Sequence, residues 1–583
     1  MADQFFARHV GRIKVGLLQT AQYQGYGSWM ETHTFLRGEP FSFEDHEYQE
    51  VLADDRSAEI NVIKCAQIGI SEFSIRRALA ILQLHAGTTV LYSLPTATFA
   101  STFVKTRFDP VIEGSPSLRE TLHPGVDSSM VKRFTNDSFL YARGASGTGQ
   151  AISVPVDFLV NDEVDFSDQG ILDTFTSRLT HSPHKGRFRL STPTIPGWGI
   201  ADHYDHSQQK VEMVKCNHCN HWFWPEYYKH VRLPGFRGDS LKEITRASLA
   251  NLNTDDAYVE CPKCGLAPSF DVANREWIVK NPDSGFSAIG YHITPFCAPN
   301  VITPGYLIKS STDYDREADF VNFGLGCSMQ DAESSLARDE VEACFVRGEP
   351  PTSYTTVMGI DMGGLCAIHI GVVMGAGDLV IIHSELCPLS RIEERRRRLK
   401  AKYRVLIEVI DGLPYTDIVL RFQSTDPNCW ASIFSNIKGL GVWAIRAQEE
   451  DETKATARLR QINVNRNKGL DTVMEWVRGG RITFFESDQK DIIVDHIVDM
   501  KRVKQFTSNN ELEFVWVKSK KGVDHYFFAL LYLYLASKLR GLATIAVKLP
   551  YLVGKMRHEA PEGRPEGLSN RQSQMDLSKL IGR

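Results

Sequence analysis

The first residues with an arrangement suited to chemistry form the loop from Lys64 to Ser71, which reads KCAQIGIS. It follows a β-branched segment and precedes a helical pattern, so backbone N–H groups and a helix N-terminus would face an anion such as phosphate. The usual phosphate loop has its lysine directly before the Ser or Thr, whereas here Ile70 takes that place and Lys64 opens the loop. The segment predicts nucleotide binding; a glycine turn and a capped helix without ligand are the alternative.

Two adjacent carboxylates, Asp162 and Glu163, end the apolar segment VDFLVN. Asp162 would serve Mg²⁺, and Glu163 would act as the base for the attacking water. Helix capping is the alternative. The hydroxyl-rich segment Ser191 to Thr194 closes another predicted strand and suits sensing of the γ-phosphate. Tyr48 and Gln49 could stack on and hydrogen-bond adenine, although such a pair is more often part of the packing.

Four of the cysteines form two CxxC pairs, Cys216 with Cys219 and Cys261 with Cys264. Four thiolates can close a tetrahedral Zn²⁺ site, and a closed site leaves no position for a substrate. The pattern therefore predicts a structural zinc module of the ribbon kind. Two unrelated buried cysteine pairs in a reduced core are the alternative.

Three separated aspartates predict a second site. Asp361 lies in the first predicted strand of a later region, Asp426 is expected to end another buried strand, and Asp524 stands at the start of an apolar helix. Carboxylates so placed can hold two Mg²⁺ or Mn²⁺ ions about 4 Å apart for phosphodiester hydrolysis. The layout indicates an RNase H-like nuclease, although each acid alone could be a cap or a turn residue. Glu385 and His525 are further candidates.

Basic residues near these aspartates are candidates for phosphate contacts that do not depend on DNA sequence. A solvated helix face is the more common explanation of such a run, and Glu393 and Glu394 partly neutralise it. The loop from Lys518 to Lys521 is the preferred DNA contact. The basic residues are Arg391, Arg395 to Arg398, Lys400, Lys402, Lys518, Lys520 and Lys521.

The elements that must position these residues indicate an α/β protein of several domains. Strand-like and helical patterns alternate between Glu59 and Thr194, which predicts a parallel sheet covered by helices. The predicted divisions are an N-terminal segment (1–40), an ATPase core (41–210), a four-cysteine module (211–282), the end of the ATPase domain with a linker (283–350), an RNase H-like domain (351–542) and a C-terminal tail (543–583).

Composition sets limits on function. The 583 residues carry a net charge of only -5, so any DNA contact must come from local patches. No apolar run of membrane-spanning length and no signal-peptide core are present, and the 11 cysteines are few and odd in number. We expect a cytoplasmic protein without a membrane contact.

Loop, acidic strand and hydroxyl strand, in this order, resemble the ATPase of tailed-phage terminase large subunits of the bacteriophage-lambda type, in which the lysine stands at the front of the loop. The resemblance places Lys64, Gln67, Gly69 and Ser71 on the phosphate loop, Asp162 and Glu163 on the metal and catalytic acids, and Ser191 to Thr194 on the coupling motif. It also implies an arginine that completes the transition-state clamp, for which Arg143 and Arg178 are candidates. The zinc module and the nuclease aspartates resemble the same family.

The resemblance implies a genome-packaging motor that uses ATP and Mg²⁺ to move double-stranded DNA into procapsids and a second, metal-dependent site to cut concatemers. It further implies a small terminase subunit and a portal protein as partners, a homo-oligomer on the portal, and a place in the bacterial host cytoplasm with transient docking on the procapsid. The alternatives are a helicase or repair ATPase with a fused nuclease, and a non-catalytic nucleic-acid scaffold.

Overall fold

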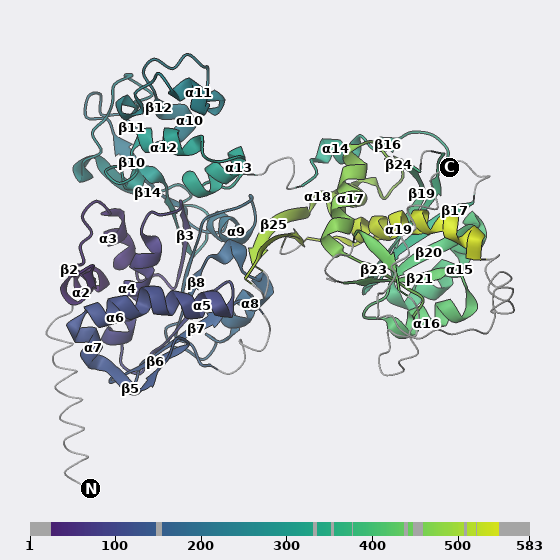
Figure 1. Ribbon diagram of the computed structural model, residues 1–583, viewed down its shortest axis with the longest axis horizontal. Coiled ribbons are helices and arrows are strands. Elements are labelled where there is room, and N and C mark those ends of the chain that lie inside the picture. The colour runs from purple at the N-terminus through teal and green to yellow at the C-terminus, as the bar shows by residue number, and fades with distance from the viewer. Residues whose placement is uncertain are drawn as a thin grey trace, which may run out of the picture. The chain divides into compact units, whose positions relative to one another are not determined.

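The structure, a computed structural model, describes residues 25–146, 154–329, 335–350, 355–375, 377–435, 441–446, 459–506, 510–519 and 522–546, with side chains to residue 540. The chain divides into two compact units, Met1–Val341 with Val494–Asp524 and Glu342–Ile493 with His525–Arg583 (Figure 1). Val494–Asp524 thus belongs to the first unit, whereas the sequence predicts a single domain over all of 351–542.

The first unit is built on one large sheet whose centre is parallel. Strands β3 and β4 are buried along almost their whole length, as expected for parallel strands covered on both faces. The strands, in sheet order, are β11 (Trp222–Phe223), β10 (Lys210–Lys215), β15 (Ile289–Ile293), β3 (Glu59–Lys64), β9 (Gly186–Ser191), β8 (Phe158–Asp162), β4 (Thr89–Leu94), β7 (Phe139–Gly144), β6 (Val131–Phe134) and β5 (Leu122–Asp127), and β14 (Arg275–Val279) pairs with β10. The predicted parallel α/β fold is therefore confirmed.

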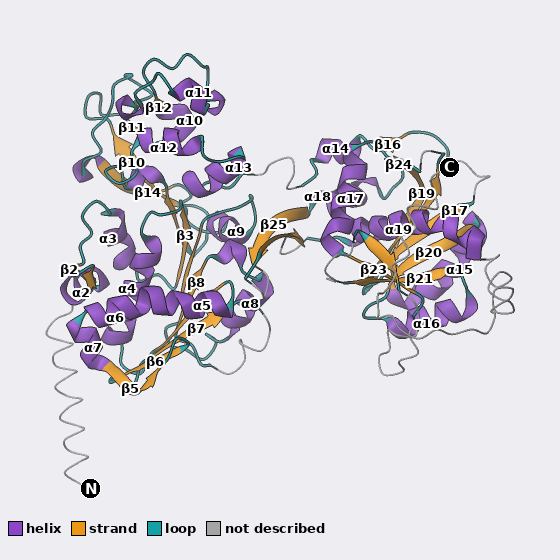
Figure 2. Ribbon diagram, in the orientation of Figure 1, coloured by secondary structure: helices purple, strands orange, loops and turns teal. Residues whose placement is uncertain are grey.

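Helices lie between and around these strands (Figure 2). The helix that follows β3 buries Phe73, Ile75 and Leu79 in the main core, so the loop before it is fixed at both ends. The helices that matter for the site are α2 (Tyr26–His33), α3 (Tyr48–Ala53), α4 (Ile70–Leu84), α5 (Ala97–Phe103), the π-helix η1 (Val104–Phe108), α6 (Asp109–Gly114), α7 (Pro116–Thr121), α8 (Gln169–Ser177), α9 (Gly199–Asp205) and α12 (Pro304–Ser311).

The cysteine-rich region grows out of one edge of this sheet. Strand β10 leads into the first CxxC pair and runs parallel to β15, so the region shares a sheet with the other strands of the first unit. Its remaining elements are short: α10 (Tyr227–His230), β12 (Val231–Arg232), α11 (Arg246–Leu249) and β13 (Tyr258–Val259).

A hairpin from late in the sequence also belongs to the first unit. It consists of β25 (Met500–Phe506) and β26 (Leu512–Lys518), which pair antiparallel along their whole length. Val503 of this hairpin packs in a small apolar cluster with Ile195 and Trp198, which follow the hydroxyl-rich segment. The hairpin therefore packs on the segment that follows β9.

The second unit contains a mixed sheet of nine strands. Strands β17, β18 and β19 are antiparallel neighbours, and β17, β20, β21 and β23 are parallel. In sheet order the strands are β16 (Phe345–Val346), β24 (Ile482–Phe485), β19 (Leu379–Pro388), β18 (Leu365–Val373), β17 (Thr356–Asp361), β20 (Val405–Asp411), β21 (Cys429–Phe434), β23 (Gln461–Val464) and β22 (Trp443–Ile445). This order confirms the predicted RNase H-like fold class.

Helix α19 (His525–Ala546) packs directly on β17. A Cβ atom at Gly359 would lie 2.2 Å from the backbone nitrogen of Leu533, so only glycine permits this approach of helix and strand. The other helices of this sequence region are α15 (Ile392–Tyr403), α16 (Thr416–Thr425), α17 (Arg466–Arg478) and α18 (Lys490–Val498). Within the part of the chain that the structure describes, no helix is both long and apolar enough to span a membrane.

Candidate functional site

The loop after β3 is shaped by two residues with positive φ. Gln67 has φ 57° and Gly69 has φ 91°, and α4 begins at the next residue. A Cβ at Gly69 would approach Gln49 Nε2 to 3.1 Å, so the loop lies directly against the N-terminal end of α3. Its backbone is tied to the sheet because the N–H of Cys65 donates to Ile293 O at 3.1 Å. The loop is thus held in one conformation beside a helix N-terminus.

Tyr48 and Gln49 support this loop. Tyr48 is 1% exposed, and its hydroxyl donates to the carbonyl of Ile68. A ring buried in this way offers no free face to a base, which contradicts the prediction that Tyr48 stacks on adenine. Tyr48 and Gln49 therefore support the phosphate loop by packing against it. This is the packing role given above as the alternative.

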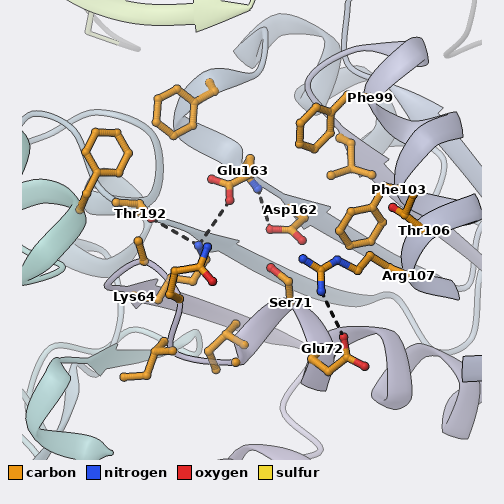
Figure 3. A pocket seen from close by; sticks show the side chains of 18 of the residues that line it. Lys64, Ser71, Glu72, Phe99, Phe103, Thr106, Arg107, Asp162, Glu163 and Thr192 are labelled. Atoms are coloured by element: carbon orange, nitrogen blue, oxygen red, sulfur yellow. Dashed lines mark hydrogen bonds and ion pairs between the residues drawn. The ribbon is translucent and has the colours of Figure 1, made fainter. Parts of the chain in front are cut away.

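The lysine and the two acids meet at the ends of β3 and β8, the two strands that flank β9. Lys64 Nζ lies 3.3 Å from Glu163 Oε1 and 3.3 Å from Thr192 Oγ1 (Figure 3). Asp162 Oδ2 accepts from the Tyr92 hydroxyl at 2.7 Å. Burial lowers the pKa of Lys64, but the nearby carboxylates of Glu163 and Asp162 outweigh it and raise that pKa. Lys64 therefore remains charged in a buried position.

The two acids differ in their surroundings. Burial, with the charge of Glu163 as a second cause, raises the pKa of Asp162 to about 6. Glu163 is more accessible, with a quarter of its side chain exposed, and it has φ 56°. Non-glycine residues with positive φ are strained, and such strain is often found at functional sites. The two carboxylates have different partners, Tyr92 for Asp162 and Lys64 for Glu163.

One cavity of about 660 Å³ lies in front of these groups. Cavities of this size accept small-molecule ligands such as nucleotides. All the phosphate-loop residues predicted from the sequence line it together with both acids: Lys64, Gln67, Gly69, Ser71, Asp162 and Glu163. Thr192 of the hydroxyl-rich segment lines the same cavity.

The rest of the hydroxyl-rich segment contacts a buried acid that the sequence analysis missed. The backbone N–H and the hydroxyl of Thr194 each donate to Asp165 Oδ2 at 2.7 Å, and Ser191 Oγ accepts from the Asp165 N–H at 3.2 Å. Burial raises the pKa of Asp165 to about 7. Because Asp165 lies three residues after Asp162, this network connects the acids directly to the segment beyond β9.

Neither predicted arginine lies among the described residues that line the cavity. Arg143 is at the end of β7 and donates to Met130 O at 3.0 Å and Ala142 O at 2.8 Å, and Arg178 follows α8. Arg107 of η1 does line the cavity, and its guanidinium points towards Asp162 and Ser71 (Figure 3). No sequence motif marks Arg107, because only the fold of α5 and η1 brings it to the phosphate loop.

The four cysteines of the CxxC pairs come together at the sheet edge. The Sγ atoms of Cys216 and Cys264 are 3.6 Å apart, those of Cys219 and Cys261 are 3.7 Å apart, and all four lie within 4.8 Å of one another. Thiolates around tetrahedral zinc, with Zn–S bonds of about 2.3 Å, would be separated by about 3.8 Å. The donor set and its spacing fit Zn²⁺.

Both cysteine turns have the same backbone pattern. Cys216 donates to His221 O at 2.9 Å and accepts from the Asn220 N–H at 2.8 Å, and Cys261 donates to Leu266 O and accepts from the Gly265 N–H, both at 3.0 Å. Asn220 and Gly265 have positive φ at equivalent positions. Two matching turns that face each other form a pre-shaped four-thiolate cage.

We expect Cys261→Ser to release zinc and to lower the melting temperature by roughly 10 °C, because losing several kcal/mol of metal binding destabilises a domain by about that amount. Zinc content by atomic absorption and thermal melting with and without a chelator measure this. Cys327→Ser, at a cysteine outside the cluster, is the control. Full stability of Cys261→Ser, with no zinc in the wild type, would contradict a structural metal.

In the second unit, the structure places Asp361 beside an acid that the sequence analysis did not single out. Asp361 ends β17, Asp411 ends the neighbouring parallel strand β20, and His525 Nδ1 lies 2.8 Å from Asp361 Oδ2. The pKa of Asp411 is raised to about 7, mainly by burial, and the charge of Asp361 adds to the increase. Ser432, opposite Asp411 on β21, has a buried hydroxyl oxygen without a hydrogen-bond partner. Asp361, Asp411 and Ser432 thus lie near the carboxyl ends of three neighbouring strands, β17, β20 and β21.

Asp426 lies elsewhere, which corrects a prediction. It follows helix α16 and precedes β21, so it stands at the opposite end of the parallel strands from Asp361. Its carboxylate is held by Lys400 and, at 3.1 Å, by Arg396, and these cations also pair with Glu408. Asp426 was expected to end a strand, but the segment before it is a helix.

The other candidates of this region have defined partners. Glu385 is paired with Arg395 and, at 3.0 Å, with His383, and these contacts hold its pKa at about 2 although burial opposes them. Asp524 immediately precedes α19 and accepts from Lys518 at 3.1 Å. Lys518 is the described member of the preferred DNA loop; Lys520 and Lys521 lie outside the described residues.

The basic run of α15 is largely neutralised. Arg397 pairs with Glu393 at 3.5 Å and Arg398 pairs with Glu394 at 2.8 Å, one helical turn away. Arg391 lies 4.0 Å from Glu394, and Lys402 lies over the Tyr403 ring. This arrangement favours a solvated helix face over a dedicated DNA contact.

A parallel α/β sheet with a phosphate loop, a buried lysine and paired strand-end acids around one cavity defines an ATPase-type nucleotide site. Residues 39–277 match the model of the family described as phage terminase large subunit gpA, ATPase domain. The resemblance predicted from the sequence is thereby confirmed.

Several solved structures of phage large terminases are similar to this chain at low identity. The large terminase of bacteriophage HK97 is 13% identical over 88% of this chain and 99% of that chain, with a TM-score of 0.46. The large terminase of a thermophilic bacteriophage is 10% identical over 86% and 99%, with a TM-score of 0.30. The large terminase ATPase domain of Thermus phage P74-26 is 14% identical over 50% and 98%, with a TM-score of 0.29. A comparison with the curated proteins finds no match.

Proposed function

We propose that this chain is the packaging motor of a tailed phage, in which ATP hydrolysis drives double-stranded DNA into a procapsid and a second, metal-dependent site cuts the DNA. The observation that supports it best is the convergence of Lys64, Asp162, Glu163 and Thr192 on one cavity within a segment of the terminase ATPase family.

The chain's own residues suggest how the ATPase site works. The loop N–H groups and Lys64 would bind the phosphates, and Ser71 with Asp162 would hold Mg²⁺, which offsets the phosphate charge when bound. In the structure Lys64 is paired with Glu163. A phosphate group would draw Lys64 away from Glu163, which frees that carboxylate to orient water and accept its proton. Because Thr192 contacts Lys64, a movement of Lys64 would be transmitted through Thr192 to Thr194 and Asp165.

For the nuclease, we propose Asp361 and Asp411 as ligands of Mg²⁺ or Mn²⁺, with Asp524 as the third carboxylate predicted from the sequence. The bound metal would supply charge for the scissile phosphate. His525, 2.8 Å from Asp361, would keep that carboxylate oriented. Asp426 is excluded from this set because Lys400 and Arg396 hold it at the other end of the strands.

The proposed partners are double-stranded DNA, a small terminase subunit, the portal protein, and further copies of this chain on the portal in the host cytoplasm. The segments predicted to contact the small subunit and the portal lie mostly outside the described residues. The helicase alternative needs a second RecA-like sheet, whereas the second unit has an RNase H-like sheet. The scaffold alternative gives no reason for a buried, charged Lys64 facing two acids.

The direct test measures ATP hydrolysis with and without linear double-stranded DNA, and cutting of supercoiled plasmid with Mg²⁺ or Mn²⁺, using the same full-length preparation. We expect DNA to stimulate ATP hydrolysis and metal to be required for cutting. ATP hydrolysis without any DNA cutting would remove the nuclease half of the proposal, and the absence of both would refute it.

We also expect Arg107→Ala to lower kcat for ATP hydrolysis by roughly 10- to 100-fold, because a guanidinium that stabilises the transferred phosphoryl contributes about 1.4 to 2.7 kcal/mol. Nucleotide binding should change less than kcat. Steady-state ATPase kinetics of Arg107→Ala and Arg107→Lys, with Arg143→Ala as the control, measure this. If Arg143→Ala is the slower enzyme, the assignment of Arg107 is wrong.

A further inference from the structure

Phe506 of β25 and Leu512 of β26 reach the nucleotide cavity. Phe506 and Leu512 face each other as the last cross-strand pair among the described residues of the hairpin, and both line the cavity with the phosphate loop. In the sequence this hairpin comes more than 300 residues after Glu163, inside the region predicted to be nuclease. No motif of the ATPase segment contains these two residues.

Polar contacts hold the hairpin in this place. Lys504 Nζ lies 2.8 Å from Asp319 Oδ1, Lys501 Nζ donates to Pro196 O at 2.8 Å, and Gln505 Nε2 donates to Ser167 O at 3.4 Å. Ser167 and Pro196 follow the paired acids and the hydroxyl-rich segment in the chain. The hairpin is therefore docked on the segments that leave the catalytic strands.

A series of aromatic rings leads from Phe506 of the hairpin to the phosphate loop. The centroid of the Phe506 ring lies 5.9 Å from that of Phe99 and 6.3 Å from that of Phe166. Phe166 in turn stacks on Phe323 at 6.2 Å, and the carbonyl of Phe323 accepts the Ala66 N–H at 2.7 Å. One side of the cavity is thus apolar, and Phe506 of the hairpin is part of it.

The cavity has a charged region and an apolar region, which suit different parts of a nucleotide. The charged phosphates fit Lys64 and the loop N–H groups, and burying them against phenylalanine rings would be costly. The base is aromatic and gains from contact with such rings. We propose that Phe506 and Leu512, with Phe99 and Phe166, form the base-contacting wall of the nucleotide site. This inference rests on the proposed ATPase function and adds a second segment of the chain to it.

The test compares two probes of different chemistry on the full-length chain by calorimetry, with Mg²⁺ present. Phe506→Ala should weaken binding of ADP by about tenfold, which corresponds to ~1.4 kcal/mol of lost ring contact. Binding of inorganic pyrophosphate, which has no base, should change by less than about twofold. Glu513→Ala, at an exposed residue of the same hairpin, is the matched control and should bind both probes like the wild type.

Each outcome decides between the two proposals. If the wild type binds neither probe, the ATPase function itself fails. If the wild type binds ADP and Phe506→Ala binds it equally well, or if the variant loses ADP and pyrophosphate binding to the same extent, the base-contacting wall is wrong. Phe506→Leu, which keeps an apolar side chain, should lie between wild type and Phe506→Ala.

A measurement on the wild type alone avoids the risk that a variant misfolds. ADP should slow amide hydrogen exchange in β25 and β26, and pyrophosphate should slow it less, because only ADP carries the base. Equal exchange in the hairpin with and without ADP, while the loop after Lys64 becomes protected, would overturn the inference.

Discussion

Replacing Glu163 with Gln should lower kcat for ATP hydrolysis by roughly 10³-fold, which is within the range that a positioned general base contributes. Gln has the shape of Glu but cannot accept a proton from water at neutral pH. Its amide oxygen can still accept a hydrogen bond from Lys64, which lies 3.3 Å from Glu163 Oε1 in the structure. We therefore expect ADP to bind to this variant with near wild-type affinity.

Steady-state kinetics and calorimetry on the same preparation separate the two effects. Glu113→Gln, at an exposed acid of α6, is the matched control and should leave kcat unchanged. Plasmid cutting by Glu163→Gln without ATP should equal that of the wild type, because the nuclease aspartates belong to other strands. A Glu163→Gln enzyme that hydrolyses ATP normally would show that the base is another residue.

The second large effect concerns the nuclease. Asp361→Asn should lower metal-dependent plasmid cutting by roughly 10³-fold, equivalent to ~4 kcal/mol of transition-state stabilisation. An amide lacks the negative charge that a divalent cation needs, and it disturbs the contact with His525. ATP hydrolysis should be unchanged.

Two further aspartates make this prediction specific. Asp411→Asn should resemble Asp361→Asn, because the two acids end adjacent parallel strands. Asp426→Asn should keep most of its cutting activity and lose stability, because it leaves Lys400 and Arg396 with fewer negative partners. Initial rates of plasmid nicking over a series of Mn²⁺ concentrations, with thermal melting of each variant, provide the comparison. Loss of cutting in Asp426→Asn with normal activity in Asp411→Asn would reverse the assignment.

Short segments of the sequence were sufficient for the phosphate loop, the acid pair and the cysteine pairs. Each of these is a run of neighbouring residues whose geometry is set by one strand end, one turn or one helix start. Lys64 and Ala66 to Ser71 line the cavity together because a strand, a loop and a helix follow one another directly. The two CxxC turns are equally local, and only their meeting required the fold of the chain between them.

The prediction of the second site was wrong at Asp426 because a helix was taken for a strand. Asp361 ends a strand as predicted, but the apolar pattern before Asp426 belongs to helix α16. Short apolar runs fit either a buried strand or a helix, so periodicity alone does not distinguish them. The carboxylate beside Asp361 comes from Asp411, because the parallel register of β17 and β20 places Ile360 next to Ile410.

Local sequence was sufficient to predict four groups: a lysine-first phosphate loop, paired acids, a four-thiolate set and a strand-end aspartate, each contained within a few residues. Which distant residues lie beside these groups follows only from the fold. Arg107 reaches the cavity through α5 and η1, Tyr48 lies behind the loop, and Phe506 returns from a hairpin late in the chain. These contacts depend on side-chain packing between segments that are far apart in the sequence. Local periodicity and spacing carry no information about such packing.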